Sequence, residues 1–443
     1  SVGPSMATRL NSQDPGFEDA FQRLLGAKRE TEPDVDDTVR RILDDVRTRG
    51  DAAVIAYTKE FDGFELSADT MAVGPEEIAV AKEKTPVDVL DALQMAAARI
   101  TEFHQHQIPD GLDYTDDAGV KLGYRWTPLA AAGLYVPGGT AAYPSSVLMN
   151  ALPAKIAGVG RLAMVVPAPR GEINPLVLTA AAIAGVDEIY RIGGAQAVAA
   201  LAYGTDTIAA VDKIVGPGNA YVAAAKRQVF GAVGIDMIAG PSEILVLADG
   251  LNDPAWIAAD LLSQAEHDRN AQAILITDDV NFADAVIAAV DGHLKTLPRA
   301  EIAAASWRDF GAVIIVEDLA AAAPLVDRLA PEHLEIAAED AAGLAKRIHN
   351  AGAIFLGRFA PEAVGDYMAG PNHVLPTARS ARFSSSLGVL DFLKRTSIIG
   401  CDGDALAAIG PATITLAEAE GLGAHALSVS IRLNRPKPDQ SGE

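Results

Sequence analysis

A helical spacing of apolar positions dominates the first third of the chain. In residues 35–48, 75–82 and 87–104, apolar side chains return every three or four positions with charged residues between them, which predicts three amphipathic helices. Gly50 follows the first of these helices as a stop signal, and Pro75 suits the first turn of the second. We therefore expect residues 6–134 to be mainly helical.

Short apolar runs rich in β-branched residues replace this pattern in the middle of the chain. Each run is followed by a glycine turn or a helical stretch, an order typical of strand–turn–helix units in a parallel sheet. The strands that we expect cover residues 161–167, 188–192, 212–215 and 235–247, the last one broken at 240–243, and the helices cover 175–184, 197–203 and 220–229.

A second alternating series follows, which is the pattern of a doubly wound sheet. No sequence repeat of 20–50 residues accompanies it. We therefore predict an α/β protein with two Rossmann-like parallel-sheet domains and a helical N-terminal segment. The expected order is helix 254–268, strand 273–277, helix 282–294, strand 312–316, helix 320–329, strand 353–356, helix 411–420 starting at a proline, strand 427–433 and a disordered polar tail.

Charge and composition narrow the class of protein. The chain has 443 residues, of which 49% are hydrophobic and 21% charged, as in ordinary globular proteins. Its net charge of −23 argues against nucleic acid or anionic membranes as partners. Residues 126–154 carry no charge and are long enough to cross a membrane. Four prolines and two adjacent glycines interrupt them, so we expect no spanning helix there.

The single cysteine, Cys401, excludes an internal disulfide and any metal site built from several thiolates. We also find no pattern of a secretory signal peptide, and residues 1–5 look like an addition before Met6. A soluble, cytoplasmic protein is therefore expected.

Three glycine turns are candidates for a phosphate or nucleotide site. Residues 135–139 (YVPGG), 193–196 (GGAQ) and 216–219 (GPGN) allow close approach of a ligand to the backbone, and helix N-termini favour anions. None of them is the usual G-x-G-x-x-G fingerprint. Taken singly, each is more typical of an ordinary turn between a strand and a helix. The presence of three such turns in one α/β unit keeps a phosphate or nucleotide ligand open as an alternative, without identifying it.

Polar residues in unusual settings suggest a metal site. Gln264 and His267 are three positions apart in LLSQAEHD, so on a helix they share one face. A zinc or similar site needs three or four donors, and nitrogen and oxygen donors are available in three other polar segments. Alternatively, Gln264 and His267 are a hydrogen-bonded polar pair near the core, and the other candidates are isolated surface or structural residues. The further candidates are Asp366, His373, Glu420 and His425.

Two more histidine-containing segments are open to interpretation. Glu332 and His333 in APEHLE are a carboxylate beside an imidazole, the commonest groups in acid–base catalysis. They also suit an exposed helix start with Pro331 in its first turn. His104 and His106 are two positions apart, so they point in different directions on a helix, and we expect both at the solvated surface.

The motifs together resemble one family, the histidinol dehydrogenases. The resemblance runs from about residue 133 to 433 and is specific, because several of the matching stretches are long. These stretches are GLYVPGG, RIGGAQAVAALAYGT, DKIVGPGNAYV, IDMIAGPSEILV, LLSQAEHD, APEHLE, GDYMAGPNHVLPT and EGLGAHALSVSIRL.

The resemblance implies roles for individual residues. It implies one Zn²⁺ per subunit, NAD as cofactor, and Glu332 and His333 as the catalytic acid–base pair. The zinc ligands would be Gln264, His267, Asp366 and His425, with His425 donated by the partner subunit of a homodimer. NAD would contact Tyr135, Gln196 and Asn219, and histidinol would contact Ser242, Gln264, His267, His333, Asp366, His373, Glu420 and His425.

The same resemblance implies a reaction and a division of the chain. L-Histidinol would be oxidised through L-histidinaldehyde to L-histidine with two NAD in turn, the last step of histidine biosynthesis. From the residues alone, a zinc hydrolase or a metal-dependent binding protein would be alternatives. The implied parts are an N-terminal arm (6–29), an α/β domain with the metal and catalytic residues (30–134 and 243–386), an NAD-binding Rossmann-like domain (135–242), a swapped C-terminal dimerisation segment (387–434) and a disordered tail (435–443).

Overall fold

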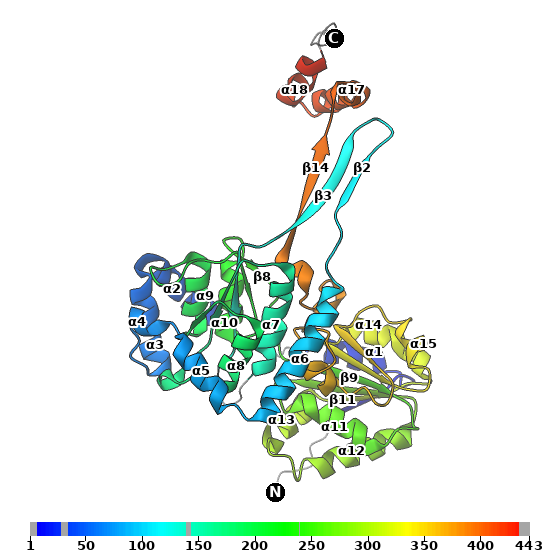
Figure 1. Cartoon of the computed structure of the whole chain (residues 1–443). Coiled ribbons are helices and arrows are strands. Elements are labelled where there is room, and N and C mark those ends of the chain that lie inside the picture. Colours follow the sequence, from blue (N-terminus) through cyan, green and yellow to red (C-terminus); the bar gives the residue numbers. More distant parts are fainter. Residues whose placement is uncertain (1–6, 28–33, 139–142, 239, 434–443) are drawn as a thin grey trace. The chain divides into compact units, whose positions relative to one another are not determined.

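The chain divides into two compact units in a computed structural model that describes residues 7–27, 34–138, 143–238 and 240–433. The first unit combines residues 1–107 and 129–392, and the second combines residues 108–128 and 393–443. Figure 1 labels many of their helices and strands. Both units are therefore assembled from segments that lie far apart in the sequence.

A six-stranded parallel sheet forms one layer of the first unit. Both faces of its central strands are apolar: Leu245 and Leu247 pack on one side, and Ile244 and Val246 pack on the other. Helices α1, α14 and α15 cover the first face, and α11, α12 and α13 cover the second (Figure 1). Burial on both sides is what parallel sheets require. The strand order is β1 (Thr8–Asn11), β11 (Ala312–Ile315), β10 (Gln272–Thr277), β9 (Glu243–Ala248), β12 (His333–Ala337) and β13 (Ala353–Leu356).

The helices of this layer connect its strands or lie at its end. Their bounds are α1 (Phe17–Gly26), α11 (Pro254–Ala265), α12 (Val280–His293), α13 (Ala300–Phe310), α14 (Ala323–Leu329), α15 (Ala341–Ala345) and α16 (Glu362–Tyr367). Short 3₁₀ turns occupy Pro169–Gly171, Leu319–Ala322, Ser380–Arg382 and Val389–Phe392.

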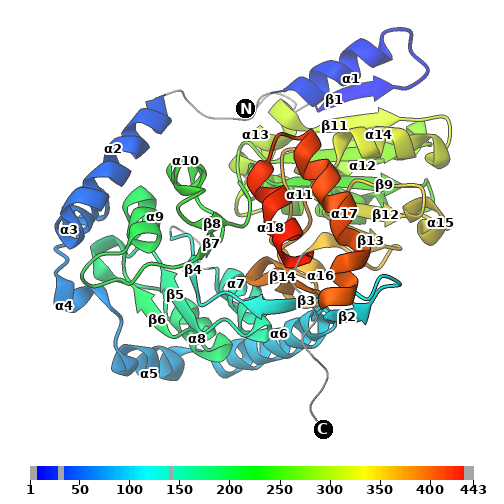
Figure 2. The same cartoon turned by 90° about the horizontal axis from the view of Figure 1, so that it is seen from above.

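A five-stranded parallel sheet forms the other layer of the first unit. Helices α2, α3, α9 and α10 share one hydrophobic core with it, and α5, α6, α7 and α8 share another (Figure 2). The strand order is β6 (Glu188–Tyr190), β5 (Arg161–Val165), β4 (Ala131–Tyr135), β7 (Lys213–Val215) and β8 (Gly234–Ile235). The helices are α2 (Asp34–Arg49), α3 (Asp51–Asp62), α4 (Ala68–Met71), α5 (Pro75–Lys84), α6 (Val87–Gln105), α7 (Pro144–Ala157), α8 (Pro175–Ala184), α9 (Gly194–Tyr203) and α10 (Ala220–Val229).

The second unit is an antiparallel sheet followed by two helices. Strand β3 lies between β14 and β2, and α17 packs on α18, where Leu433 and Val429 surround Gly410. The bounds are β2 (Leu112–Thr115), β3 (Lys121–Pro128), β14 (Leu393–Gly400), α17 (Gly403–Ala419) and α18 (Gly423–Leu433).

The α/β class with two parallel sheets is confirmed, while several local predictions are wrong. Residues 427–433 belong to helix α18, because their apolar positions also match at a spacing of four. The predicted start of a helix at Pro411 lies inside α17, where packing against α18 outweighs the missing proline N–H. Strands β1 to β4 interrupt the helical stretch that we expected over residues 6–134.

The described residues of the uncharged run 126–154 include the end of β3, all of β4 and most of α7, which contains Pro153. No helix among the described residues is long and apolar enough to cross a membrane. The expected disordered tail, residues 435–443, lies outside the described residues. Residues 34–62, which we expected with the metal-binding residues, pack on the five-stranded sheet, and the proposed domain boundaries stay a prediction.

His104 is buried, contrary to expectation, whereas His106 is exposed. The Nδ1 atom of His104 donates a hydrogen bond to the Ile100 carbonyl at 2.7 Å, and burial lowers the pKa of its ring. The Nδ2 atom of Asn372 lies 3.4 Å from Nε2, the other ring nitrogen. His104 is therefore a neutral core residue, which its position in an amphipathic pattern did not reveal.

Candidate active site

One cavity of about 1280 Å³ in the first unit is lined by loops of both parallel sheets. Most of the residues singled out from the sequence lie on its wall. Glu420 directly follows α17 and His425 lies in α18, so both belong to the second unit. The predicted residues on the wall are Tyr135, Gln196, Asn219, Ser242, Gln264, His267, Glu332, His333, Asp366 and His373.

The glycine turns meet at the carboxyl ends of the five-stranded sheet. Strands β4 and β7 are neighbours, but the chain proceeds from β4 towards β5 and from β7 towards β8. Loops that follow two such strands diverge and leave a crevice, the usual dinucleotide position in these folds. Tyr135 ends β4, and Gly216 directly follows β7.

The turn at Gly193 begins helix α9 earlier than expected, since α9 starts at Gly194 rather than Ala197. Gly194 has φ +66°, and its N–H donates a hydrogen bond to the Tyr135 hydroxyl at 2.9 Å. Burial raises the pKa of Tyr135 to about 12, so its hydroxyl keeps its proton at neutral pH. The buried Oε1 atom of Gln196 has no hydrogen-bond partner among the described residues. This loop therefore offers polar groups to a ligand.

A buried ion pair fixes the turn at Gly216. Lys226 forms an ion pair with Asp236, and the two side chains are only 3% and 1% exposed. Lys226 Nζ also donates to the Gly216 carbonyl at 2.9 Å, and Gly216 N–H donates to Asp236 Oδ2 at 2.9 Å. Asn219 caps α10 by accepting a hydrogen bond from Val222 N–H at 3.1 Å. Both ends of this turn are thus held in place.

The second half of the site lies at the amino ends of the six-stranded sheet. His333 is the first residue of β12, and Glu243 is the first residue of the neighbouring strand β9. Helix α11 follows β9 and returns along the sheet, so its last turn with Gln264 reaches the same edge. His267 lies just beyond that helix, where its N–H donates to the Gln264 carbonyl at 3.1 Å.

Glu332 and His333 do not form an exposed helix start, and that alternative is wrong. Both residues are buried at the beginning of a parallel strand, because the apolar residues that follow them belong to the centre of the sheet. His333 Nδ1 donates to the Glu243 carbonyl at 2.9 Å, and Glu332 Oε2 accepts from Glu243 N–H at 2.8 Å. Since a carbonyl only accepts, the neutral ring of His333 carries its proton on Nδ1.

The surroundings shift the pKa values of His333 and Glu332 in opposite directions. Burial lowers the pKa of His333, although the negative charge of Asp366 opposes this effect. Burial raises the pKa of Glu332 well above its ordinary value, and nearby carboxylates add to the effect. The Nε2 atom of His333 is buried and has no hydrogen-bond partner among the described residues. The ring is therefore a neutral base whose unprotonated nitrogen is available.

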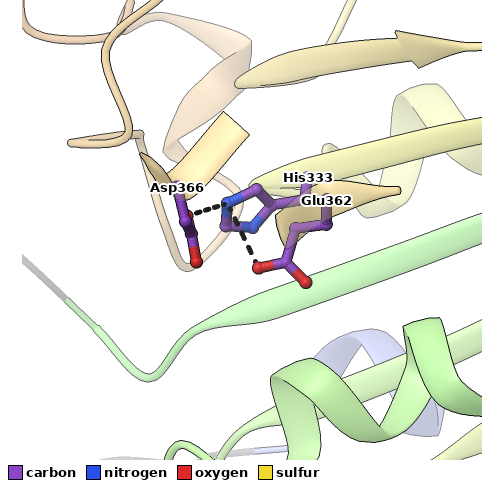
Figure 3. Close-up of side chains that lie close together, drawn as sticks. All are labelled: His333, Glu362 and Asp366. Carbon is purple, nitrogen blue, oxygen red and sulfur yellow. Dashed lines mark ion pairs between the residues drawn. The ribbon is translucent and has the colours of Figure 1, made fainter. Parts of the chain in front are cut away.

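Three side chains of the described residues form a group with the geometry of a metal site: His333, Glu362 and Asp366 have ligand atoms within 4.8 Å of one another. His333 Nε2 lies 3.8 Å from Glu362 Oε1 and 3.9 Å from Asp366 Oδ1 (Figure 3). Gln264 Oε1 is buried without a hydrogen-bond partner in the described chain. An unpaired amide oxygen and a carboxylate beside a neutral imidazole fit a nitrogen- and oxygen-liganded divalent ion.

His373 faces the same group from the loop after α16. Its Nδ1 donates to the backbone carbonyl of Asp366 at 3.0 Å, and burial lowers the pKa of its ring. The hydrogen bond leaves Nε2 as the unprotonated nitrogen. The structure thus brings Asp366 and His373, seven positions apart, to the same end of α16.

A buried acidic cluster behind this group was not recognised from the sequence. Burial raises the pKa of Glu362 to about 8, and its Oε2 accepts a hydrogen bond from Ser263 Oγ at 2.9 Å. Burial also raises the pKa of Glu335 well above its ordinary value and that of Asp260 to about 6. Glu362 and Asp366 are four positions apart in EAVGD, a spacing that could have indicated a shared helix face.

Comparisons with known proteins agree with this arrangement. The model of the family described as Histidinol dehydrogenase matches residues 26–433. Histidinol dehydrogenase of Rhodospirillum rubrum is 65% identical over 431 residues, covering 97% of this chain and 99% of that protein. That of Ruegeria pomeroyi is 64% identical over 426 residues, covering 96% and 98%. The crystal structure of histidinol dehydrogenase from Elizabethkingia anophelis matches with a TM-score of 0.92 and 36% identity, covering 96% and 98%.

Proposed function

The chain belongs to the histidinol dehydrogenase family, and we propose that it oxidises L-histidinol through L-histidinaldehyde to L-histidine with NAD, the last step of histidine biosynthesis. One observation carries the proposal: a single cavity joins the glycine turns of one sheet to the Glu332–His333 pair of the other. A dehydrogenase needs such a joint site, because the alcohol carbon has to meet the nicotinamide while a base takes the proton.

His333 is the base for the alcohol proton. Its Nε2 atom is buried, unprotonated and without a hydrogen-bond partner among the described residues, and the lowered pKa keeps the ring neutral. The bond from Nδ1 to the Glu243 carbonyl orients the ring and stabilises the cation that forms when Nε2 takes up the proton. Proton transfer by a positioned base contributes about 10²–10⁴-fold to the rate.

Glu332 activates water for the second oxidation. Its raised pKa makes the carboxylate a stronger base than an exposed glutamate, which suits proton abstraction from water. The hydrogen bond from Glu243 N–H engages Oε2 of this carboxylate and leaves Oε1 for the water. His333 then removes a proton from the resulting gem-diol. Retaining the aldehyde in the cavity between the two steps protects it from side reactions.

NAD binds at the glycine turns, with contacts from Tyr135, Gln196 and Asn219. The protonated hydroxyl of Tyr135 and the unpaired amide oxygen of Gln196 support hydrogen bonds to the cofactor. When bound, NAD accepts the hydride of each oxidation. The fixed turn at Gly216 supports a site that is formed before the cofactor arrives.

One zinc ion per subunit is held by Gln264, His267, Asp366 and His425, with His425 coming from the second subunit of a homodimer. The unpaired Oε1 atom of buried Gln264 and the grouping around Asp366 support an ion at this place. A bound zinc ion would orient the imidazole and amino groups of histidinol and so hold the alcohol carbon in position. Ser242, His333, His373 and Glu420 complete the substrate site in this proposal.

Exposed apolar side chains on both units support the homodimer with a swapped C-terminal segment. Leu416, Leu427 and Ile431 on the helices of the second unit are 59–66% exposed. Phe359 and Tyr367 of the first unit are also exposed, and Tyr367 directly follows Asp366. Surfaces of this kind are typical of protein interfaces. We also expect the enzyme to act in the cytoplasm, in keeping with the absence of a disulfide among the described residues.

The test is the appearance of NADH absorbance when the purified protein is given histidinol and NAD, with chromatography for histidine. Two NADH per histidine are expected. A zinc hydrolase would form no NADH, and a binding protein would bind histidinol without consuming it. Either result would contradict the proposal. Mixing His425→Ala and Gln264→Ala chains tests the shared site, because activity should return only in mixed dimers.

A further inference from the structure

Both proposed catalytic side chains depend on the backbone of one residue, Glu243. Its N–H donates to Glu332 Oε2 at 2.8 Å, and its carbonyl accepts from His333 Nδ1 at 2.9 Å. A shift of this peptide segment would therefore displace the water-activating carboxylate and the base together. Contacts that hold residues 240–243 in place therefore also hold the side chains of Glu332 and His333 in place.

Two hydrogen bonds in opposite directions join this segment to residues 377–378. Gly240 N–H donates to Thr377 Oγ1 at 2.7 Å, and Ala378 N–H donates to Glu243 Oε1 at 3.1 Å. We refer to this pair of hydrogen bonds as the 240/377 clamp. The clamp brackets Ser242, which is itself a proposed substrate contact, and Thr377 and Glu243 are both buried. Its two hydrogen bonds hold both ends of the segment, at residues 240 and 243.

The loop that supplies the clamp has an unfavourable backbone. Ala378 and Arg379 have φ +52° and +64°, in the left-handed region that residues with a Cβ atom rarely adopt. Two other hydrogen bonds hold it there: Arg379 Nε donates to the Arg328 carbonyl at 3.1 Å, and Ser380 N–H donates to the Thr377 carbonyl at 3.0 Å. Strain of this kind persists only where the surroundings impose it, and it concentrates near functional sites.

We propose that Thr377 and the Glu243 carboxylate are positioning residues that hold the Gly240–Glu243 backbone in register with Glu332 and His333. The inference rests on the proposed function in one respect, namely that Glu332 and His333 are the acid–base pair. Neither Thr377 nor the Glu243 carboxylate takes part in proton transfer. Their effect is to keep the donor and acceptor of residue 243 where the two side chains need them.

The first test compares Thr377→Val with Thr377→Ser in the full-length holoenzyme. Valine has the same shape but cannot accept the Gly240 N–H, whereas serine can. Thr377→Val should lower kcat for histidinol oxidation by about 10–100-fold, since small misplacements at a catalytic centre have effects of this size. The KM for NAD should change by less than about twofold, and Thr377→Ser should recover most of kcat.

Thr58→Val is the matched control for this experiment. Thr58 is a fully buried threonine of α3 outside the cavity lining, and its Oγ1 has no partner among the described residues. Its replacement should leave kcat unchanged. A loss in Thr377→Ser as large as that in Thr377→Val would show that keeping the hydroxyl is not sufficient and would overturn the proposal. An unchanged kcat in Thr377→Val would also overturn it, because it would show that Thr377 acts by packing alone.

A second pair of variants tests the other half of the clamp and covers the case in which Thr377→Val does not fold. Glu243→Gln keeps a side-chain oxygen for Ala378 N–H, and Glu243→Leu does not. Glu243→Gln should retain more kcat than Glu243→Leu, with circular dichroism confirming the fold of both. Equal kcat in the two would contradict the proposal. A wild-type enzyme that forms no NADH from histidinol would instead refute the proposed function, independently of the clamp.

Discussion

The two parallel sheets of the first unit contribute to one cavity from opposite strand ends. The five-stranded sheet presents the turns after β4 and β7, at carboxyl ends, where ligand sites of open α/β sheets usually lie. The six-stranded sheet presents the starts of β9 and β12 instead. The general rule therefore locates the proposed dinucleotide half of this site and misses the half that carries the proposed acid–base pair.

The two halves also differ in what they are made of. The carboxyl-end half consists of glycine turns held by Tyr135 and by the Lys226–Asp236 pair, so the backbone faces the ligand. The amino-end half consists of buried carboxylates and imidazoles with shifted pKa values. We infer that the first half mainly binds and the second half mainly performs chemistry. Substitutions on the two sides should then separate KM for NAD from kcat.

The largest effect is expected from His333→Asn. It removes the unprotonated Nε2 atom from the amino-end half and leaves the glycine turns unchanged. The kcat of the first oxidation should fall by about 10²–10⁴-fold. The affinity for NAD, measured by isothermal titration, should stay within a few-fold of wild type. A similar loss in both quantities would show that the two halves do not act separately.

Glu332→Gln should distinguish the two oxidations. The oxidation of histidinaldehyde should fall by about 10²-fold or more, whereas the oxidation of histidinol should fall much less, because only the second step needs activated water. Single-turnover kinetics with each substrate would measure this. Since burial raises the pKa of Glu332 and lowers that of His333, the second step should lose its rate at a higher pH than the first as the solution is acidified. Identical pH profiles would contradict the division of roles.

Asp236→Asn addresses the carboxyl-end half. The buried ammonium group of Lys226 would lose its counter-charge, which destabilises the turn at Gly216. The KM for NAD should rise by about 5–10-fold, corresponding to a loss of roughly 1–1.4 kcal/mol in binding, and kcat should change little. Steady-state kinetics with varied NAD would measure both. A fall in kcat without a change in KM would assign the ion pair to the catalytic half.

The smallest effect is expected on stability, from Glu335→Gln. Burial raises the pKa of Glu335 in the folded protein, so the folded state favours the protonated acid. The resulting stabilisation is complete below the ordinary pKa of about 4.3 and is lost as the pH rises towards the folded value. Glutamine resembles the protonated acid at every pH. The variant should therefore show a higher Tm than wild type at pH 9 and a similar Tm at pH 5, and equal Tm values at pH 9 would contradict this.

The elements with clear local signals were predictable. The bounds of α8 and α10 match the sequence prediction because each has an asparagine cap, and α8 also starts with a proline and ends at Gly185. Strand β13 was also predicted with its observed bounds. Strand β12 was not, because Pro331 and Glu332 directly precede it and it contains His333 and Glu335, a composition typical of an exposed helix start rather than a buried strand.

Residues of the candidate site were predictable only where they belong to a recognisable sequence motif. Tyr135, Gln264, His333 and Asp366 lie on one cavity wall, in agreement with the resemblance, although their roles stay predictions. Glu243 and Thr377 were missed, because their importance comes from burial and from partners about 90–140 positions away, which spacing along the chain does not encode. Glu362 was also missed, although its spacing of four from Asp366 is a local signal. The resemblance to a known family predicted that residues of distant motifs form one site, which the hydrophobic periodicity of the chain could not predict.

Because His333 Nδ1 is hydrogen-bonded to the Glu243 carbonyl, the imidazole cannot relay a proton from Nε2 to a further acceptor through Nδ1. A peptide carbonyl cannot pass a proton onward, so a proton taken up at Nε2 cannot leave through the opposite side of the ring. It has to return to the cavity by the same atom. Each turnover should thus release the first proton into the cavity from Nε2 before His333 can act as a base in the second oxidation.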